Sequence, residues 1–124
     1  MQLRCVIIDD DARFLDVARP SLERGGVIVA GVAGSRAAAV QRVAALRPDV
    51  VLVDIRLGAE SGFDVARDLA ASGHAARLIM ISSHAEADYA DLIAEAPVAG
   101  FLPKTELSAA AIRHGNPADP ARLS

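Results

Sequence analysis

The sequence predicts an α/β fold in which five parallel strands alternate with five helices, a doubly wound sheet with helices on both faces. The first observation is a series of short apolar runs without polar alternation, as in strands that are buried on both faces. The second is that amphipathic segments bounded by Gly, Ser or Pro lie between these runs. The regular alternation predicts a parallel sheet with right-handed crossovers.

Composition limits the classes of protein that fit the chain. Its 124 residues, with 52% hydrophobic and 23% charged residues, suit one globular domain. No apolar stretch approaches the roughly 20 residues that span a bilayer. Because the first residues lead directly into a strand-like run, we expect no targeting segment and a cytoplasmic location.

Charge and cysteine content exclude two further classes. The net charge is −3 and the basic residues are scattered, which argues against binding of nucleic acid by this chain alone. Cys5 is the single cysteine and lies within an apolar run. We therefore expect a buried structural thiol and no disulfide within the chain.

The first βα unit begins with a strand at Leu3–Ile8. Asp11 can cap a helix over Ala12–Arg24, which Gly25-Gly26 would end. Pro20 falls inside this helix and is expected to kink or shorten it, because proline lacks a backbone donor. The apolar stripe of the helix comprises Phe14, Leu15, Ala18 and Leu22.

The second unit begins with a strand at Val27–Val32. Gly34 provides a turn, and Ser35 can cap a helix over Arg36–Leu46. The third unit begins with the apolar strand Val50–Val53. The expected inward faces of the second and third helices are Ala37, Val40, Val43 and Ala44, and then Phe63, Ala66, Leu69 and Ala70.

The third helix is expected to follow a loop that passes through Gly62 and to end at Gly73. Leu78–Ile81 forms the fourth strand, followed by a helix over Glu86–Glu95. The apolar stripe of that helix comprises Tyr89, Leu92, Ile93 and Ala96. A short strand at Gly100–Leu102 precedes a last helix over Glu106–His114, so we expect one domain over 1–115 and a flexible tail over 116–124.

Polar side chains stand at the ends of the predicted strands. Asp9-Asp10 follow the first strand, Asp54 ends the third, Ser82 ends the fourth and Lys104 follows the fifth. Since the carboxyl ends of parallel strands share one edge, these residues should converge there. Crowded carboxylates repel unless a cation lies among them, and Mg²⁺ suits such oxygen ligands. A lysine and a serine could bind phosphoryl oxygens, which leaves a carboxylate as the nucleophile.

At these positions the chain resembles the receiver domain of two-component response regulators. The resemblance covers Leu3 to about His114. It depends on five motifs: Val6-Ile7-Ile8-Asp9-Asp10, Val53-Asp54-Ile55-Arg56-Leu57, Ser61-Gly62-Phe63, Ile81-Ser82-Ser83 and Gly100-Phe101-Leu102-Pro103-Lys104. It implies a flavodoxin-like three-layer sandwich with strand order 2-1-3-4-5.

The resemblance also implies a phosphotransfer site that contains Mg²⁺. Asp54 would be the phosphoacceptor, which receives a phosphoryl group from a sensor histidine kinase or phosphotransfer protein. Asp10 would bind Mg²⁺ directly, Asp9 through water, and Arg56 through its backbone carbonyl. The chain would then be a stoichiometric phosphoacceptor, with self-catalysed phosphotransfer and dephosphorylation, and not a turnover enzyme.

A conformational switch is the second implication of the resemblance. The Ser82 hydroxyl would turn toward the phosphoryl group, Lys104 would pair with it, and the Phe101 rotamer would follow Ser82. A downstream effector would then bind the face formed by the fourth helix, fifth strand and fifth helix. A homodimer is left open.

Three departures from the family pattern stand near the site. Gly58 occupies a position where the family often has proline, which is expected to loosen the loop after the acceptor. Proline precedes Lys104 here, whereas the family often has it after the lysine, so the loop that approaches Lys104 could differ in shape. Arg56 and His84 lie two residues after the acceptor and the switch hydroxyl, at positions that tune the lifetime of the phosphoryl group in that family. The sequence does not indicate whether they lengthen or shorten it.

Simpler interpretations of the same residues stay open. The acidic run could be only a capped helix start, with Asp11 as the cap, and Ser82 could be a helix cap. Lys104 could be a solvated surface lysine and Phe101 a core residue. For the whole chain, one alternative is a pseudo-receiver that serves as a phosphorylation-independent docking or dimerisation module. Another is an aspartate-nucleophile phosphohydrolase. That class usually places a second Asp two residues after the nucleophile, and the presence of Arg56 at this position argues against it.

Overall fold

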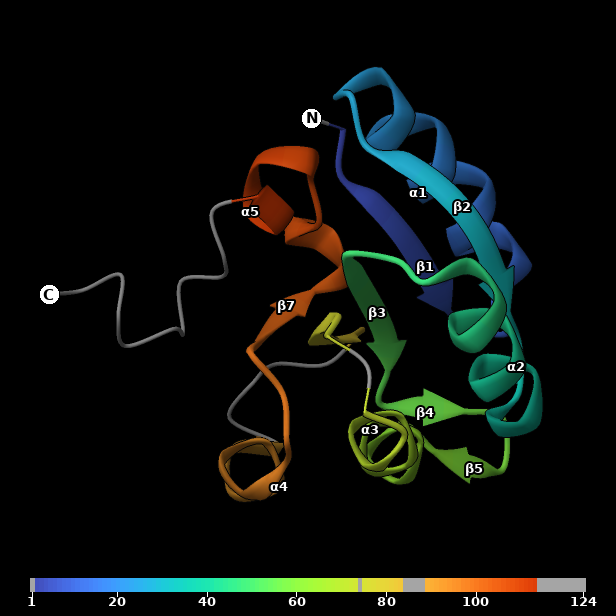
Figure 1. The fold of residues 1–124 in the computed structure, drawn as a ribbon. Helices are drawn as coiled ribbons and strands as arrows, with labels where there is room; N and C mark the ends of the chain where they lie inside the picture. The colour runs from blue at the N-terminus through green and yellow to red at the C-terminus, as the bar shows by residue number, and fades with distance from the viewer. Residues whose placement is uncertain (1, 74, 84–88, 114–124) are drawn as a thin grey trace, which may run out of the picture.

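A sheet of five parallel strands forms the middle layer of the computed structural model, which describes residues 2–73, 75–83 and 89–113. The strands are β1 (Arg4–Ile8), β2 (Ile28–Ala33), β3 (Val50–Asp54), β6 (Arg77–Ser82) and β7 (Gly100–Pro103). Their order is β2-β1-β3-β6-β7, with all neighbours parallel (Figure 1). The predicted fold class and strand order are therefore confirmed.

Helices cover both faces of this sheet. They are α1 (Ala12–Arg24), α2 (Arg36–Leu46), α3 (Gly62–Ala71), α4 (Ala90–Glu95) and α5 (Ala109–Arg113). Residues of α1 and α5 pack on one face, and residues of α2, α3 and α4 pack on the other. None of the helices in the described ranges has the length and apolar content needed to cross a membrane.

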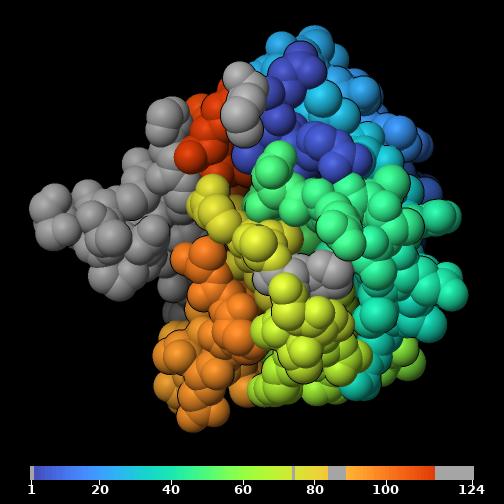
Figure 2. Space-filling model, in the orientation of Figure 1, coloured from blue at the N-terminus to red at the C-terminus, as the bar shows by residue number. Residues whose placement is uncertain are grey.

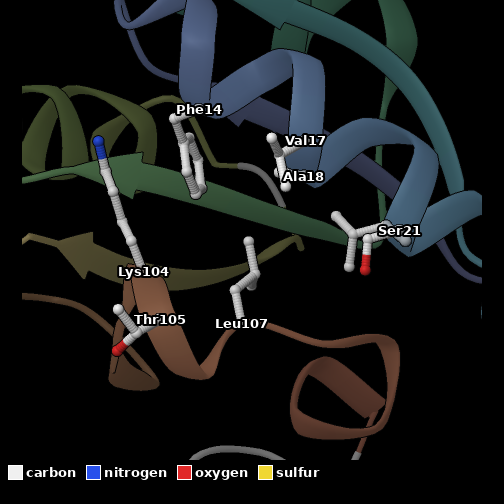
Figure 3. Close-up of a pocket in the computed structure, with 8 residues that line it drawn as sticks. Phe14, Val17, Ala18, Ser21, Lys104, Thr105 and Leu107 are labelled. Carbon is white, nitrogen blue, oxygen red and sulfur yellow. The ribbon is translucent and has the colours of Figure 1, made fainter.

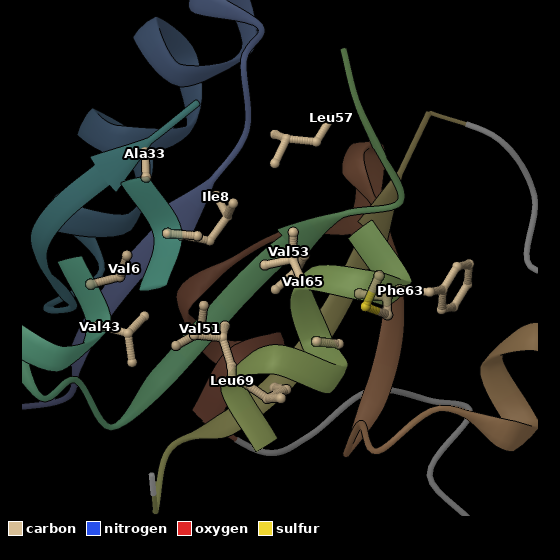
Figure 4. Close-up of a cluster of buried hydrophobic side chains, with 14 of the residues drawn as sticks. Val6, Ile8, Ala33, Val43, Val51, Val53, Leu57, Phe63, Val65 and Leu69 are labelled. Carbon is tan, nitrogen blue, oxygen red and sulfur yellow. The ribbon is translucent and has the colours of Figure 1, made fainter. Parts of the chain in front are cut away.

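Alternate residues of each strand supply two separate apolar cores. Val51 of β3 faces α2 and α3, and Figure 4 shows its side chain with Val43 and Leu69 in the first core. Leu52, the next residue, faces Ile112 of α5 in the second core. Both strand residues are fully buried, and each such side chain contributes about 1.5–3 kcal/mol to the free energy of unfolding. This explains why the strand sequences show no polar alternation.

The first helix follows the predicted bounds and runs unbroken through Pro20. Asp11 caps it, with its carboxylate accepting hydrogen bonds from the backbone N–H of Arg13 at 3.0 Å and of Phe14 at 3.3 Å. Pro20 does not shorten the helix, contrary to expectation. Because Pro20 and Asp16 are both exposed, water can satisfy the Asp16 carbonyl that lacks its helical donor.

Two of the predicted inward residues of α2 are wrong. Ala37 and Ala44 are exposed, and Ala39 is buried beside Val43. The reason is that α2 is rich in alanine, so its sequence hardly distinguishes an inward face from an outward one.

Smaller corrections apply to α3 and α4. Ala70 is exposed while Val65, one turn earlier, is fully buried. In α4, Leu92 is 46% exposed, although Tyr89 and Ile93 pack against the core as predicted. The expected helix start at Glu86 lies outside the described residues.

A small hairpin replaces the loop expected after Asp54. It pairs β4 (Arg56–Leu57) with β5 (Glu60–Ser61) in antiparallel register. Gly58 and the next residue form its two-residue turn, and Gly58 has φ of +61°. A positive φ at the first turn residue alone is the type II′ geometry that requires glycine. Gly58 therefore closes a hairpin where the sequence predicted a loop.

The segment after β7 begins with a tight turn. Lys104–Glu106 form a 3₁₀ turn, and α5 starts at Ala109, later than predicted, because Leu107 is extended. The hydroxyl of Ser108 accepts a hydrogen bond from the Ala111 N–H at 3.0 Å and so caps α5. His114 and the predicted tail over 116–124 lie outside the described residues.

Two further contacts complete the fold. Cys5 is fully buried, and burial raises the pKa of its thiol to about 12, which confirms the structural interpretation. Arg36 of α2 pairs with Asp68 of α3, with Nη2 and Oδ1 at 3.0 Å. The two helices adjoin on the face seen in Figure 2, where α3 is yellow-green and α2 is cyan to green.

We predict that Gly62→Ala destabilises the fold by about 3 kcal/mol or more, because overpacked sites must move backbone. A Cβ at Gly62 would lie 1.9 Å from the backbone oxygen of Asp54, where α3 begins against the end of β3. Urea unfolding measures the loss. The matched control is Gly34→Ala, whose Cβ would make an ordinary contact at 3.7 Å with Asp10. Equal stability of the two variants would contradict this close approach.

Candidate functional site

The carboxyl ends of the strands meet at a polar cavity, as the sequence predicts. Asp54 ends β3, Ser82 ends β6, Asp9 follows β1 and Lys104 follows β7. The cavity has a volume of about 200 Å³. Its lining residues are Asp10, Asp11, Asp54, Arg56, Ser82, Ser83 and Lys104.

Lys104 joins two carboxylates from neighbouring strands. Its Nζ lies 2.8 Å from Asp9 Oδ2 and 3.2 Å from Asp54 Oδ2. The Lys104 side chain is only 11% exposed, so solvent screens these ion pairs less than it would screen a surface pair. Burial alone would lower the pKa of Lys104, but the two carboxylates raise it above its usual value. Lys104 is therefore a charged, largely buried bridge and not a solvated surface lysine, although a proline precedes it.

Asp9 is the most deeply buried acid of the site. Its Oδ1 accepts a hydrogen bond from the backbone N–H of Asp11 at 2.9 Å. Its Oδ2 accepts no well-aligned hydrogen bond from the described residues, even though Lys104 lies near. A buried carboxylate oxygen with spare lone pairs is a ready acceptor for a further donor or a cation.

Asp54 is buried and carries a perturbed pKa. Burial and the nearby charge of Asp9 raise the pKa of Asp54 from 3.8 to about 6. Lys104 and the backbone N–H of Arg56, which donates to Asp54 Oδ1 at 3.2 Å, act in the opposite direction. Near neutral pH the Asp54 carboxylate is therefore ionised but incompletely solvated, which suits a nucleophile.

Three carboxylates of the site can act together on a cation. Asp9, Asp10 and Asp54 each offer one oxygen, and these oxygens lie within 4.8 Å of one another. Asp9 and Asp54 are buried and Asp10 is exposed. The cluster fits a hard divalent cation such as Mg²⁺, which binds few carboxylates and keeps several waters.

The remaining predicted site residues lie around this cluster. Ser82 is buried and pairs in register with Pro103 of β7. Phe101 is buried opposite Met80, within the core that faces α2, α3 and α4. Arg56 is exposed on β4, two residues after the acid. His84 lies outside the described residues.

Two contacts at the site were not predicted from the sequence. The ring of Phe14, which the sequence suggested only as part of an apolar stripe, lies 4.5 Å from Lys104 Nζ. The start of α3 approaches the Asp54 backbone at Gly62, where the space is too small for the Cβ of any other residue. The close approach at Gly62 could have been suspected, because this glycine starts a helix shortly after the acid. Nothing in the sequence indicated the contact of Phe14 with Lys104.

Comparison with known proteins gives a family match over most of the chain. The model of the response regulator receiver domain matches residues 5–113. The chain is 36% identical over 85 residues to protein-glutamate methylesterase/protein-glutamine glutaminase 5 of Myxococcus xanthus, which covers 68% of this chain and 24% of that protein. It is 27% identical over 104 residues to the DNA-binding transcriptional activator EvgA of Escherichia coli, which covers 84% of this chain and 51% of EvgA. The chain thus spans about half the length or less of these relatives.

A solved structure gives the same result for the fold. The signal receiver domain of NarL from Mycobacterium tuberculosis is similar to this chain with a TM-score of 0.82 and 30% sequence identity. The similarity covers 91% of this chain and 94% of that domain. The sheet order and the acid cluster described above therefore occur in a chain that is similar to a receiver domain over nearly its whole length.

We predict that the Asp54 carboxyl of the Mg²⁺-free protein titrates near pH 6, as measured by carboxyl ¹³C NMR. Asp9→Asn should lower that pKa, because it removes a neighbouring negative charge. The folded pKa exceeds the ordinary 3.8, so the stabilising contribution of protonated Asp54 is lost as the pH rises through about 6. Asp54→Asn should therefore gain stability over the wild type most clearly above pH 6. Titration at the ordinary value of 3.8 would contradict the burial and repulsion described here.

Proposed function

Because this chain belongs to the response regulator receiver domain family of two-component systems, we propose that Asp54 accepts a phosphoryl group from a histidine kinase or a phosphotransfer protein. The observation that carries the proposal is the bridge of Lys104 between Asp54 and Asp9 beside a cluster of oxygen ligands. It combines a nucleophilic carboxylate, a fixed cation and a cation site in one cavity. These are the parts that phosphoryl transfer requires.

The proposed reaction is a transfer and not a hydrolysis. An Asp54 carboxylate oxygen forms a bond to phosphorus while the bond between phosphorus and the donor imidazole nitrogen breaks, and that nitrogen keeps the electron pair. The ionised form of Asp54 is needed, and it predominates above about pH 6. Lys104 is placed to neutralise charge on the phosphoryl oxygens as the new bond forms. The chain is modified once per event, so it acts as a stoichiometric phosphoacceptor.

Magnesium has a defined place in this proposal. Asp10 and Asp54 would bind Mg²⁺ directly, Asp9 through water, and the backbone carbonyl of Arg56 would supply a further oxygen. When bound, the ion would neutralise charge on the phosphoryl oxygens. The exposure of Asp10 beside two buried acids supports this arrangement, because it leaves one side of the cluster open to water and donor.

The proposed output is a change on the face formed by α4, β7 and α5. A phosphoryl group on Asp54 would attract the hydroxyl of Ser82 and the ammonium of Lys104, and Phe101 would follow with a change of rotamer. Two facts support this route. Ser82 lines the same cavity as Asp54, and Phe101 lies two residues before the Ser82 partner Pro103 on β7. The exposed Leu92 of α4 would lie on the surface that an effector reads.

The partner that reads the switch is an effector or a second copy of the chain. EvgA, of which the chain spans about half, is a DNA-binding activator, so a DNA-binding effector is one candidate for the partner that reads the switch. A homodimer through the same face is another. Transfer from a kinase also agrees with the cytoplasmic location that the sequence suggests.

We predict that incubation with Mg²⁺ and acetyl phosphate adds the mass of one phosphoryl group to the intact chain. Asp54→Asn and excess EDTA should each abolish the adduct, because the nucleophile or the cation is then missing. Asp10→Asn should slow the reaction at least about tenfold, since even outer partners of a metal ligand cost that much. Intact mass spectrometry over time measures all four samples.

The matched control for Asp10→Asn is Asp11→Asn, which changes a neighbouring acid that caps α1 and offers no ligand to the cluster. Asparagine caps helices as well as aspartate does, so this variant should react like the wild type. An unmodified wild-type chain, or an adduct that survives Asp54→Asn, would rule out the proposed acceptor. The first result would favour the pseudo-receiver alternative.

A further inference from the structure

The aromatic ring of Phe14 completes the surroundings of the Lys104 ammonium. Nζ lies 4.5 Å from the ring centroid, and Figure 3 shows the lysine stem running alongside the ring. We infer that Phe14 is a positioning residue for phosphoryl acceptance, which holds Lys104 at the carboxylates through a cation–π contact. This inference rests on the proposed function of Asp54 and adds a residue to its machinery.

The charges around Lys104 favour a contact between its ammonium and the ring. Asp9 and Asp54 lie on one side of the ammonium, and the face of Phe14 lies close by. A ring face carries negative potential, and its attraction for an ammonium is strongest where water is excluded. With the lysine side chain only 11% exposed, the contact operates in that favourable range.

The backbone of Phe14 is linked through Asp11 to Asp9, the same acid that pairs with Lys104. Asp9 accepts a hydrogen bond from the Asp11 N–H at 2.9 Å, and Asp11 accepts one from the Phe14 N–H at 3.3 Å. Asp9 also pairs with Lys104, whose ammonium lies against the Phe14 ring. Together these contacts join the first turn of α1 to the turn after β7. The backbone that carries the ring is therefore joined to the site, and the ring itself contacts Lys104.

Core packing alone does not explain the position of the Phe14 ring. Phe14 is only partly buried, and it borders a cavity of about 270 Å³ between α1 and the turn after β7. Val17, Thr105 and Leu107 are among the other residues that line this cavity. Because open space adjoins the ring, leucine can replace it at a smaller cost than in a close-packed core. A test by substitution is therefore informative.

The contact between Phe14 and Lys104 matters most once Asp54 carries a phosphoryl group. The new acyl phosphate carries its negative charge on the phosphoryl oxygens, farther out than the original carboxylate oxygen. Lys104 must then change partners, and its four-carbon stem could swing toward the adjoining cavity. Lys104 and Phe14 both line that cavity, and the attraction of the ring for the ammonium opposes such a swing and keeps Nζ near the acid cluster.

We predict that Phe14→Leu slows modification by saturating acetyl phosphate about fivefold, the size expected when a partly desolvated cation–π contact is lost. The half-saturating Mg²⁺ concentration should stay unchanged, because no metal ligand is altered. Phe14→Tyr, which keeps a ring face, should restore the rate to within about twofold of the wild type. Val17→Ala is the matched control, because Val17 lines the same cavity but is 71% exposed on α1.

A spectroscopic readout separates this role from a merely structural one. The ε-methylene protons of Lys104 should show an upfield ring-current shift in the wild type and in Phe14→Tyr, and Phe14→Leu should lose it. A wild-type rate for Phe14→Leu, or a Phe14→Tyr rate as low as that of Phe14→Leu, would overturn the inference. An unshifted Lys104 signal in the folded wild type would overturn it as well. If the wild type accepts no phosphoryl group, the proposed function fails, and the positioning role falls with it.

Discussion

The ion pair network of Lys104 is the interaction on which the rest of the site depends. Its Nζ joins Asp9, which follows β1, to Asp54, which ends β3. Two buried carboxylates on adjacent strands would repel each other, and the lysine offsets that repulsion in an environment with little solvent screening. The network is possible because β1 and β3 are neighbours and β7 lies at the edge of the same sheet. The sheet order thus decides which charges meet.

The strands could be predicted from sequence because burial on both faces leaves an apolar run that few other structures produce. The helix faces were harder. In α2 the alanines give almost no contrast between inside and outside, so Ala39 was missed and Ala37 was wrongly placed inward. The hairpin after Asp54 was also missed. Its turn depends on the positive φ of Gly58, and a single glycine in a sequence does not indicate which φ it adopts.

For the site, the sequence predicted the residues at strand ends, because parallel topology brings them together whatever the loops do. The convergence of Asp9, Asp54 and Lys104 follows from that rule. Phe14 could not be found in the same way, since its contact depends on how a helix side chain and a lysine on a later turn point toward each other. Such contacts need the packed structure, and here the contact extends the site beyond the strand ends.

The most direct measurement is a crystal structure of the protein with Mg²⁺ and fluoroberyllate, a phosphoryl mimic that binds a carboxylate oxygen. We expect the mimic on Asp54, with Mg²⁺ at about 2.1 Å from oxygens of Asp10, Asp54 and the Arg56 carbonyl. Lys104 should contact the fluorine atoms, still against the ring of Phe14. A mimic bound elsewhere, or a Lys104 that turns away into solvent, would contradict the account.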